Sequence, residues 1–269
     1  VGEASLDAAQ MPFTEMARAV ALLGQQAGER DLPGIETLPL GIASASVAAP
    51  PWLLDVIDVI PYGFVQPNGS ITGVMADFAQ ALSKACGHPI ETRLVPIARA
   101  LQNINRGSSD LTILLPVSGF DSEVQSIARL TQLEVEVLPR KGLVLDSKAS
   151  LRGLRIASLS GGAGYGMIAD LEGVLHQRTN SLSSMLQLLR SGRVDAVASV
   201  RHSLRQGLLE EGMRSAELGA AFVLGRLDLN LWATAGFAQA DRTRLAEAAS
   251  KITRSGQAAK IVAQYANNA

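Results

Sequence analysis

The glycine-rich stretch Ser160-Gly-Gly-Ala-Gly-Tyr-Gly166 is the segment of this sequence best suited to hold a ligand through its backbone. It follows the apolar residues 154–159 and precedes a helix expected to reach residue 175, so a strand, a tight turn and a helix are predicted. Glycines let backbone N–H groups approach a ligand closely, and the start of a helix favours a negatively charged group. The residues expected to contact a ligand here are Ser160, Gly161, Gly162, Ala163 and Tyr165.

Two arginines have positions that suit the binding of an anion. Arg99 stands at the start of a helix predicted over residues 97–106, and Arg201 directly follows the apolar strand predicted at 196–200. A guanidinium group can donate two parallel hydrogen bonds to a carboxylate or a phosphate. A solvated surface charge is the alternative interpretation of Arg99. If both arginines face one cleft, the sequence predicts a small anionic ligand.

Two aromatic residues, Tyr62 and Phe64, follow the strand predicted at residues 52–58, at its carboxyl end. Ligands of open α/β sheets bind beyond the carboxyl ends of the strands. Because aromatic residues form only 4% of the chain, we expect at least one of this pair to contact a ligand. The alternative is that they pack in the core and fix the turn.

Other kinds of functional site find little support in the sequence. The three histidines, His88, His176 and His202, lack the spacing of metal ligands, so we predict no metal site. The single cysteine, Cys86, cannot form an internal disulfide. We also predict no cofactor. The glycine-rich stretch lacks the Gly-Lys-Ser/Thr of a nucleotide-phosphate loop. Neither a Ser-His-Asp order nor a nucleophile elbow is evident, and we expect a binding protein rather than an enzyme.

One local pattern occurs twice and indicates how these residues are positioned. Gly107-x-x-Asp110 and Gly192-x-x-Asp195 each follow a predicted amphipathic helix and lead into a continuous apolar run, at 111–115 and 196–200. Glycine can end a helix in the left-handed conformation, and a wholly apolar strand suits a parallel sheet covered on both faces. The pattern predicts two similar α/β lobes, and the cleft between two lobes is a common place for a small ligand.

Length and charge agree with a two-lobed binding protein. The chain has 269 residues and a net charge of −1, so neither nucleic acid nor an anionic membrane surface is an expected partner. It lacks a run of about 18 apolar residues that would span a membrane. Because it begins at Val1 rather than Met, we expect a chain that was either processed, with its signal peptide removed, or trimmed. Residues 1–50 predict a helix near 11–27 and then an extended linker, of unclear role.

Seven short phrases, in one order, resemble the extracellular solute-binding proteins of the polar amino acid ABC importer type (family 3, with the type 2 periplasmic binding protein fold). The likeness covers about residues 53–265. The phrases are Ile60-Pro-Tyr-Gly-Phe64, Asn68-Gly-x-Ile-Thr-Gly73, Pro96-x-x-Arg99-Ala, Gly107-x-x-Asp110, Leu151-x-Gly153-x-Arg-Ile, Gly192-Arg-x-Asp195-Ala-Val and Ser255-Gly-x-x-x-Lys260-Ile.

The resemblance implies an α/β, bilobal Venus-flytrap in which two crossover strands join the lobes. Lobe 1 would comprise residues 51–138 plus 232–269, and lobe 2 residues 139–231. It also implies a monomer that is periplasmic, or extracellular and membrane-associated. Its partners would be a small-molecule solute and either the membrane subunits of an ABC transporter or a sensor partner.

This chain departs from the family at two positions that recognise α-amino acids. Arg201 follows Ser199 and Val200 where the family usually carries an Asp for the ligand ammonium. After Leu115 and Pro116, the Arg that usually holds the α-carboxylate is missing. We still expect Leu115, Pro116, Ser199 and Arg201 to border the ligand, but an ordinary amino acid is not the expected one.

Two other functions remain open. The fold also resembles periplasmic cyclohexadienyl dehydratases, whose chemistry needs a buried general acid. The nearest carboxylates at the crossovers are Glu134, Glu136 and Asp228, and the alternating pattern of residues 133–138 predicts that both glutamates face solvent. The other alternative is a degenerate flytrap that has lost its ligand and acts as an interaction module.

Overall fold

The computed structural model of the protein describes residues 49–116 and 119–266. All of these residues belong to one compact unit, Ala48–Ala269. The helix and linker expected in the first 50 residues lie outside the described residues, except for the last two positions.

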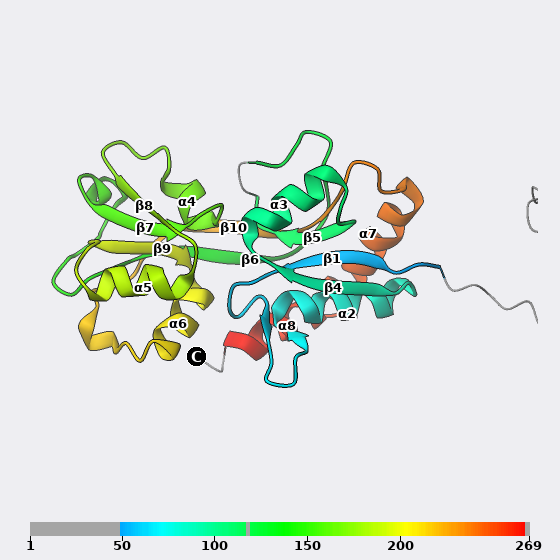
Figure 1. Ribbon diagram of the computed structural model, residues 1–269, viewed down its shortest axis with the longest axis horizontal. Coiled ribbons are helices and arrows are strands. Elements are labelled where there is room, and N and C mark those ends of the chain that lie inside the picture. Colours follow the sequence, from blue (N-terminus) through cyan, green and yellow to red (C-terminus); the bar gives the residue numbers. More distant parts are fainter. Residues whose placement is uncertain (1–48, 117–118, 267–269) are drawn as a thin grey trace, which may run out of the picture. The chain divides into compact units, whose positions relative to one another are not determined.

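An eight-stranded sheet runs through this unit in the order β4-β1-β5-β10-β6-β9-β7-β8 (Figure 1). The strands are β1 (Trp52–Ile57), β4 (Ile90–Val95), β5 (Leu111–Leu114), β6 (Gln125–Pro139), β7 (Arg155–Leu159), β8 (Leu175–Thr179), β9 (Ala196–Val200) and β10 (Phe222–Ala233). A separate two-stranded ribbon consists of β2 (Phe64–Val65) and β3 (Ile71–Thr72).

Strand pairing separates the sheet into two parallel groups joined by two long antiparallel strands. β1 is parallel to β4 and β5, and β7 is parallel to β8 and β9. Between these groups, β10 pairs with β5, β6 pairs with β9, and β6 and β10 pair with each other. We call the β1 group lobe 1 and the β7 group lobe 2. The bilobal α/β fold with two crossover strands, expected from the sequence, is confirmed.

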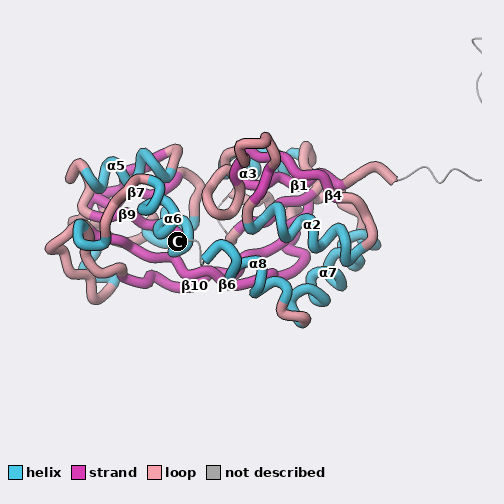
Figure 2. Tube along the Cα trace, turned by 90° about the horizontal axis from the view of Figure 1, so that it is seen from below, coloured by secondary structure: helices cyan, strands magenta, loops and turns pink. Residues whose placement is uncertain are grey.

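Helices cover both groups of strands. Lobe 1 carries α2 (Val74–Cys86), α3 (Ile97–Arg106), α7 (Gln239–Arg254) and α8 (Gln257–Ala266), and lobe 2 carries α4 (Ala163–Ile168), α5 (Leu182–Arg190) and α6 (Arg201–Glu210). Short 3-10 turns lie at Lys148–Leu151 and Ser215–Glu217. α2, α7 and α8 pack against one another on one side of lobe 1 (Figure 2).

The prediction that a helix runs from the glycine-rich stretch to residue 175 is wrong for the second half of that segment. α4 ends at Ile168, and β8 begins at Leu175. β8 lies at the edge of the sheet and most of its side chains are exposed or half-buried, so it has no apolar run that sequence patterning could detect.

The repeated Gly-x-x-Asp pattern has one structural role in both lobes. Gly107 and Gly192 have positive φ angles of 69° and 70° after α3 and α5. The Asp110 carboxylate then accepts a hydrogen bond of 2.8 Å from the backbone N–H of Leu53 in β1. Likewise, the Asp195 carboxylate accepts one of 2.9 Å from the N–H of Arg155 in β7. Each Asp therefore ties the start of its own strand to the start of the neighbouring strand.

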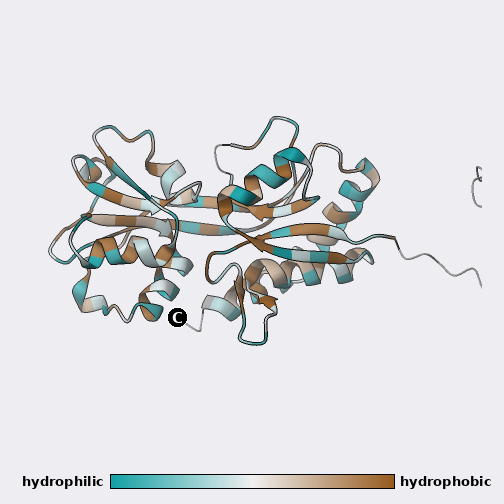
Figure 3. Ribbon diagram, viewed as in Figure 1, coloured by the Kyte–Doolittle hydropathy of each residue, from teal (hydrophilic) through white to brown (hydrophobic). Residues whose placement is uncertain are grey.

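Apolar side chains concentrate on the strands, which are largely brown in Figure 3, whereas the helices alternate in colour. All residues of β5 and β9 are buried, as their apolar runs predict. The α2 side chains Met75, Phe78 and Leu82 complete the core of lobe 1. Among the described helices, none has both the length and the apolar character needed to cross a membrane.

Candidate functional site

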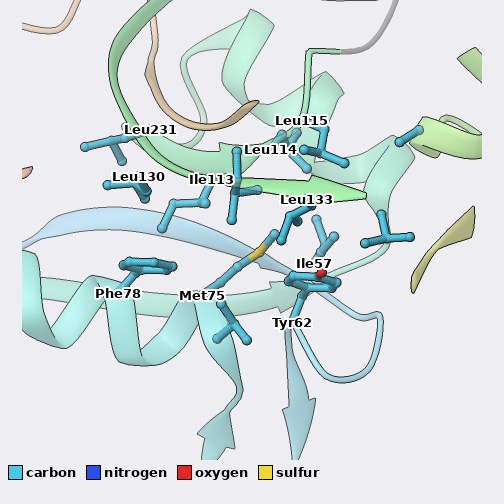
Figure 4. Close-up of a cluster of buried hydrophobic side chains, with 14 of the residues drawn as sticks. Ile57, Tyr62, Met75, Phe78, Ile113, Leu114, Leu115, Leu130, Leu133 and Leu231 are labelled. Carbon is cyan, nitrogen blue, oxygen red and sulfur yellow. The ribbon is translucent and has the colours of Figure 1, made fainter. Parts of the chain in front are cut away.

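An apolar cavity of about 50 Å³, which we call the interlobe cavity, lies where the two lobes meet. The lining residues come from both lobes and both crossover strands, and several of them are drawn in Figure 4. They are Ile57, Val59, Tyr62, Met75, Ile97, Leu114, Leu115, Leu133, Leu159, Gly161, Gly162, Ala163, Ser199, Val200 and Leu229.

The strand ends explain why these residues meet. Ile57, Leu114, Leu159 and Val200 are the last residues of β1, β5, β7 and β9. Parallel strands of one group end at the same edge, and the crossover strands bring the two edges to face each other. The interlobe cavity is therefore the place where a ligand of this fold class is expected.

A larger groove of about 540 Å³, the outer groove, adjoins the interlobe cavity and shares Val59, Ile97 and Leu159 with it. The other residues that line it are Asp58, Ile60, Pro96, Ala98, Ser160, Asn180, Ser181, Leu182 and Glu210. Two of these, Asp58 and Glu210, carry carboxylates, and none carries a positive charge. The cleft thus has an apolar inner part and an outer part of mixed polarity whose charged side chains are two carboxylates.

The glycine-rich stretch lines the cleft and also packs against α3 and β9. Gly161 has a φ of 73°, and a Cβ atom at this position would lie 3.5 Å from Cγ2 of Ile97 and 3.8 Å from Cδ1 of Leu101. The turn before α4 therefore lies against α3 of the other lobe. At Gly164, a Cβ atom would lie 2.1 Å from the Ala198 carbonyl oxygen, so this glycine allows α4 to pack directly on β9.

The structure brings together only part of the set of residues singled out in the sequence. Tyr62, Leu115, Gly161, Gly162, Ala163 and Ser199 line the interlobe cavity, and Ser160 lines the outer groove. Phe64, Arg99, Pro116, Tyr165 and Arg201 line neither of them. Phe64 is half-buried in β2, and the side chains of Arg99 and Pro116 are exposed.

Arg201, the first residue of α6, points to the crossover strand β6. Its guanidinium group forms ion pairs with Glu134 and Glu136, and Glu134 also pairs with Arg226 at 2.7 Å. The hydrogen bond from Arg226 and the charge of Arg201 lower the pKa of Glu134, and the hydrogen bond to Glu136 raises the pKa of Arg201. The positive charge of Arg201 is therefore balanced within the protein.

The prediction that both glutamates of β6 face solvent is wrong. Glu136 is only 6% exposed and Glu134 is half-buried. Alternation along a strand distinguishes its two faces, but it cannot show that α6 and Arg201 cover the second face.

Tyr165 contacts its own lobe rather than the cleft. The guanidinium carbon of Arg178 lies 4.3 Å from the centre of the Tyr165 ring, and Arg178 also donates a hydrogen bond to the Tyr165 hydroxyl. The ring of His176 meets it edge-on at 5.7 Å. Tyr165 thus joins α4 to the edge strand β8.

Sequence reasoning missed most of the apolar lining. Four of the missed residues end strands, and this position could have indicated that they reach the cleft: Ile57, Leu114, Leu159 and Val200. Leu133 of β6 and Leu229 of β10 come from the two crossover strands, and the sequence gives no signal for them beyond their hydrophobicity. In the described part of the chain, no group of three His, Cys, Asp or Glu side chains is placed to hold a metal ion.

No protein-family model matches the chain, and no curated protein sequence matches it either. Solved structures do match. The arginine-, lysine-, histidine-binding protein ArtJ from the thermophilic bacterium Geobacillus stearothermophilus is 15% identical, with a TM-score of 0.67 over 80% of this chain and 95% of that one. The solute receptor for L-cysteine of Neisseria gonorrhoeae is 17% identical, with a TM-score of 0.65 over 80% and 89% of the two chains.

A histidine kinase sensor domain with similarity to periplasmic binding proteins is 16% identical, with a TM-score of 0.68 over 81% of this chain and 96% of that one. At such identities the likeness concerns the fold. The structures that share it include a solute receptor, an amino-acid-binding protein and a sensor domain. The described part of this chain has the bilobal type 2 periplasmic binding protein fold of amino acid ABC transporter substrate-binding proteins.

Proposed function

We propose that this protein is a non-enzymatic receptor that binds a small solute in the cleft between its lobes and closes around it. The solute has an apolar end, which enters the interlobe cavity, and an amino group or another cationic group, which lies in the outer groove. The observation that carries this proposal is the lining of the cleft, which is apolar inside and carries two carboxylates and no positive charge outside.

The charges of the cleft favour a cation over the anion suggested by Arg99 and Arg201. Arg201 is paired with two glutamates, and Arg99 lines neither part of the cleft. Asp58, which follows β1, and Glu210, which ends α6, both line the outer groove, one from each lobe. An ammonium group between them gains attraction from both carboxylates when the lobes close, and that difference in affinity shifts the equilibrium towards the closed state.

The volumes of the interlobe cavity and the outer groove determine how much of the solute each can hold. A cavity of about 50 Å³ has room for only a few non-hydrogen atoms, since a single water molecule needs about 10–15 Å³ of cavity volume. The outer groove, at about 540 Å³, falls within the range of about 300–1,000 Å³ that is usual for ligand pockets. Each methylene group buried in the apolar part adds about 0.8 kcal/mol to binding.

The cellular role belongs to the same proposal. We propose a receptor that acts outside the cytoplasm and delivers its solute to an ABC importer or reports it to a sensor partner. The functions named for the structures that share its fold support both roles. We also propose that the functional lobes comprise residues 51–138 plus 232–269 and residues 139–231, and that the receptor acts as a monomer.

Thermal unfolding with matched ligands tests the proposal. Primary alkylamines should raise Tm, whereas carboxylates with the same alkyl chains should not. At 100 times Kd the stabilisation is about 2.7 kcal/mol, which corresponds to a Tm rise of about 5–10 °C. Stabilisation by carboxylates alone, abolished in Arg99→Ala, would contradict the cationic solute and support the anionic one.

The Asp58→Asn variant should weaken amine binding about threefold, because ion pairs near solvent contribute up to about 1 kcal/mol. Combining it with Glu210→Gln should raise the loss to about tenfold, measured as Kd by calorimetry. Asp170→Asn is the matched control, since Asp170 is exposed and lines neither part of the cleft. Equal Kd values for wild type and the double variant would rule out the two carboxylates as ligand contacts.

One observation favours a second candidate, a flytrap that stays closed and serves as an interaction module. The turn at Gly161 already lies against Ile97 and Leu101 while the inner cavity is small. For this function, no small molecule in a panel of amines, carboxylates and amino acids would change Tm.

A further inference from the structure

The Tyr62 side chain is one of the two polar side chains that line the interlobe cavity. It is 3% exposed and lines the interlobe cavity together with Ile57, Met75 and Leu133. Figure 4 draws these four side chains within one buried cluster. Its hydroxyl oxygen has no hydrogen-bond partner among the described residues. The other side-chain hydroxyl in the lining is that of Ser199, which comes from the opposite lobe.

An unpartnered buried hydroxyl lowers stability, because folding removes the water that satisfied it in the unfolded chain. A phenylalanine would fill the same space without that loss. Burial also raises the pKa of Tyr62 far above its ordinary value, so the hydroxyl stays neutral and can both donate and accept a hydrogen bond. Such a group in an apolar binding cavity is explained if its partner arrives with the ligand.

We propose that Tyr62 is the specificity-determining residue of the cleft and selects solutes whose apolar end terminates in one uncharged polar atom, such as a hydroxyl, ether or carbonyl oxygen. This inference rests on the proposed function, since it concerns the inner end of the same ligand. A terminal methyl group would leave the Tyr62 hydroxyl unpartnered. A terminal carboxylate would be buried without a cation, since none lines the cavity.

Matched pairs of ligands test this selection. Each ω-amino alcohol with two to six carbons is compared with the n-alkylamine that has the same number of non-hydrogen atoms, and Kd is measured by calorimetry. For the length that fits best, wild type should bind the amino alcohol about tenfold more tightly, because one neutral hydrogen bond contributes about that factor. Tyr62→Phe should abolish or reverse this preference and still bind alkylamines.

Tyr165→Phe is the matched control, because the Tyr165 hydroxyl bonds to Arg178 and lies outside the cleft lining. It should keep the wild-type preference. If Tyr62→Phe prefers amino alcohols as strongly as wild type does, the inference is overturned while the proposed function stands. If no amine binds wild type, the proposed function itself is overturned, and the inference with it.

The ligand-free protein gives an independent measurement. Tyr62→Phe should have the same Tm as wild type or a higher one, because it removes a buried hydroxyl that has no partner. A lower Tm would show that the hydroxyl already has a partner in the ligand-free protein. That result would overturn the role proposed for it.

Discussion

The Asp195 carboxylate of lobe 2 takes part in both hydrogen bonds and ion pairs. Its carboxylate accepts a hydrogen bond from the backbone N–H of Arg155 and forms ion pairs with the side chains of Arg155 and Arg140, at 3.3 Å and 3.4 Å. The hydrogen bond from the Arg155 side chain is the main cause that lowers the pKa of Asp195. The charged carboxylate therefore stabilises the start of β7.

This interaction predicts how stability depends on pH. The pKa of Asp195 is lower in the folded chain than its unfolded value of about 3.9, so its contribution is complete above that value and is lost as pH falls through the folded-state pKa. Asp195→Asn should lower the free energy of unfolding by about 1–2 kcal/mol at pH 7. The difference from wild type should vanish in acid.

Urea unfolding of both proteins between pH 7 and pH 2 measures this difference. Asp146→Asn is the control, because Asp146 is exposed and has no arginine partner among the described residues. A constant difference between wild type and Asp195→Asn down to pH 2 would contradict the assignment.

Arg201 shows why some side chains of the candidate site could not be predicted. The sequence places it directly after β9, next to Ser199, which does line the cavity. The structure begins α6 at Arg201 and directs its side chain to Glu134 and Glu136, far away in the sequence. Strand patterns predicted which positions reach the edge of the sheet, but the direction of a long side chain depends on distant charges.

At the scale of elements, local patterns predicted the boundaries of a helix in lobe 1 and of a strand in lobe 2. The helix expected at residues 97–106 and the strand expected at 196–200 coincide with α3 and β9. The turn chemistry of glycine and the apolar runs determine these elements locally. The edge strand β8 and the full length of β6 and β10 depend on pairing between distant segments, which no local pattern contains.

Two glycines of α4, Gly164 and Gly166, should differ in how much stability is lost when each is replaced by alanine. Gly164→Ala would place a methyl group 2.1 Å from the Ala198 carbonyl oxygen, so α4 must move away from β9. We expect a loss of about 2 kcal/mol in stability, in the range of overpacked cores. Gly166 lies in the same helix, and a Cβ atom there would contact nothing within 4 Å.

Gly166→Ala should therefore leave stability unchanged or raise it by up to about 1 kcal/mol, because alanine favours the helix. Thermal unfolding of both variants compares the two glycines directly. Equal effects would mean that α4 does not pack on β9 in solution.

At the scale of the described unit, apolar side chains contact one another across the cleft between the lobes. Ile97 of α3 lines both the interlobe cavity and the outer groove, and it faces Gly161 of lobe 2. Under the proposed function, these contacts should favour the closed arrangement before any ligand binds. A ligand then needs to supply only the remaining difference in affinity between the open and closed states.

Replacing Ile97 with serine tests this coupling. Ile97→Ser removes apolar contact across the cleft, so the ligand-free protein should populate the open state more, and the apparent Kd for an alkylamine should rise in proportion. Spin labels at Gln80→Cys in α2 and Gln187→Cys in α5, in a Cys86→Ser background, report the distance between the lobes, since both glutamines are exposed.

We expect a longer distance between the spin labels in ligand-free Ile97→Ser, and the wild-type distance at saturating amine. If the ligand-free distance equals that of wild type while Kd still rises, Ile97 acts as a ligand contact alone, and contacts between the lobes do not control closure.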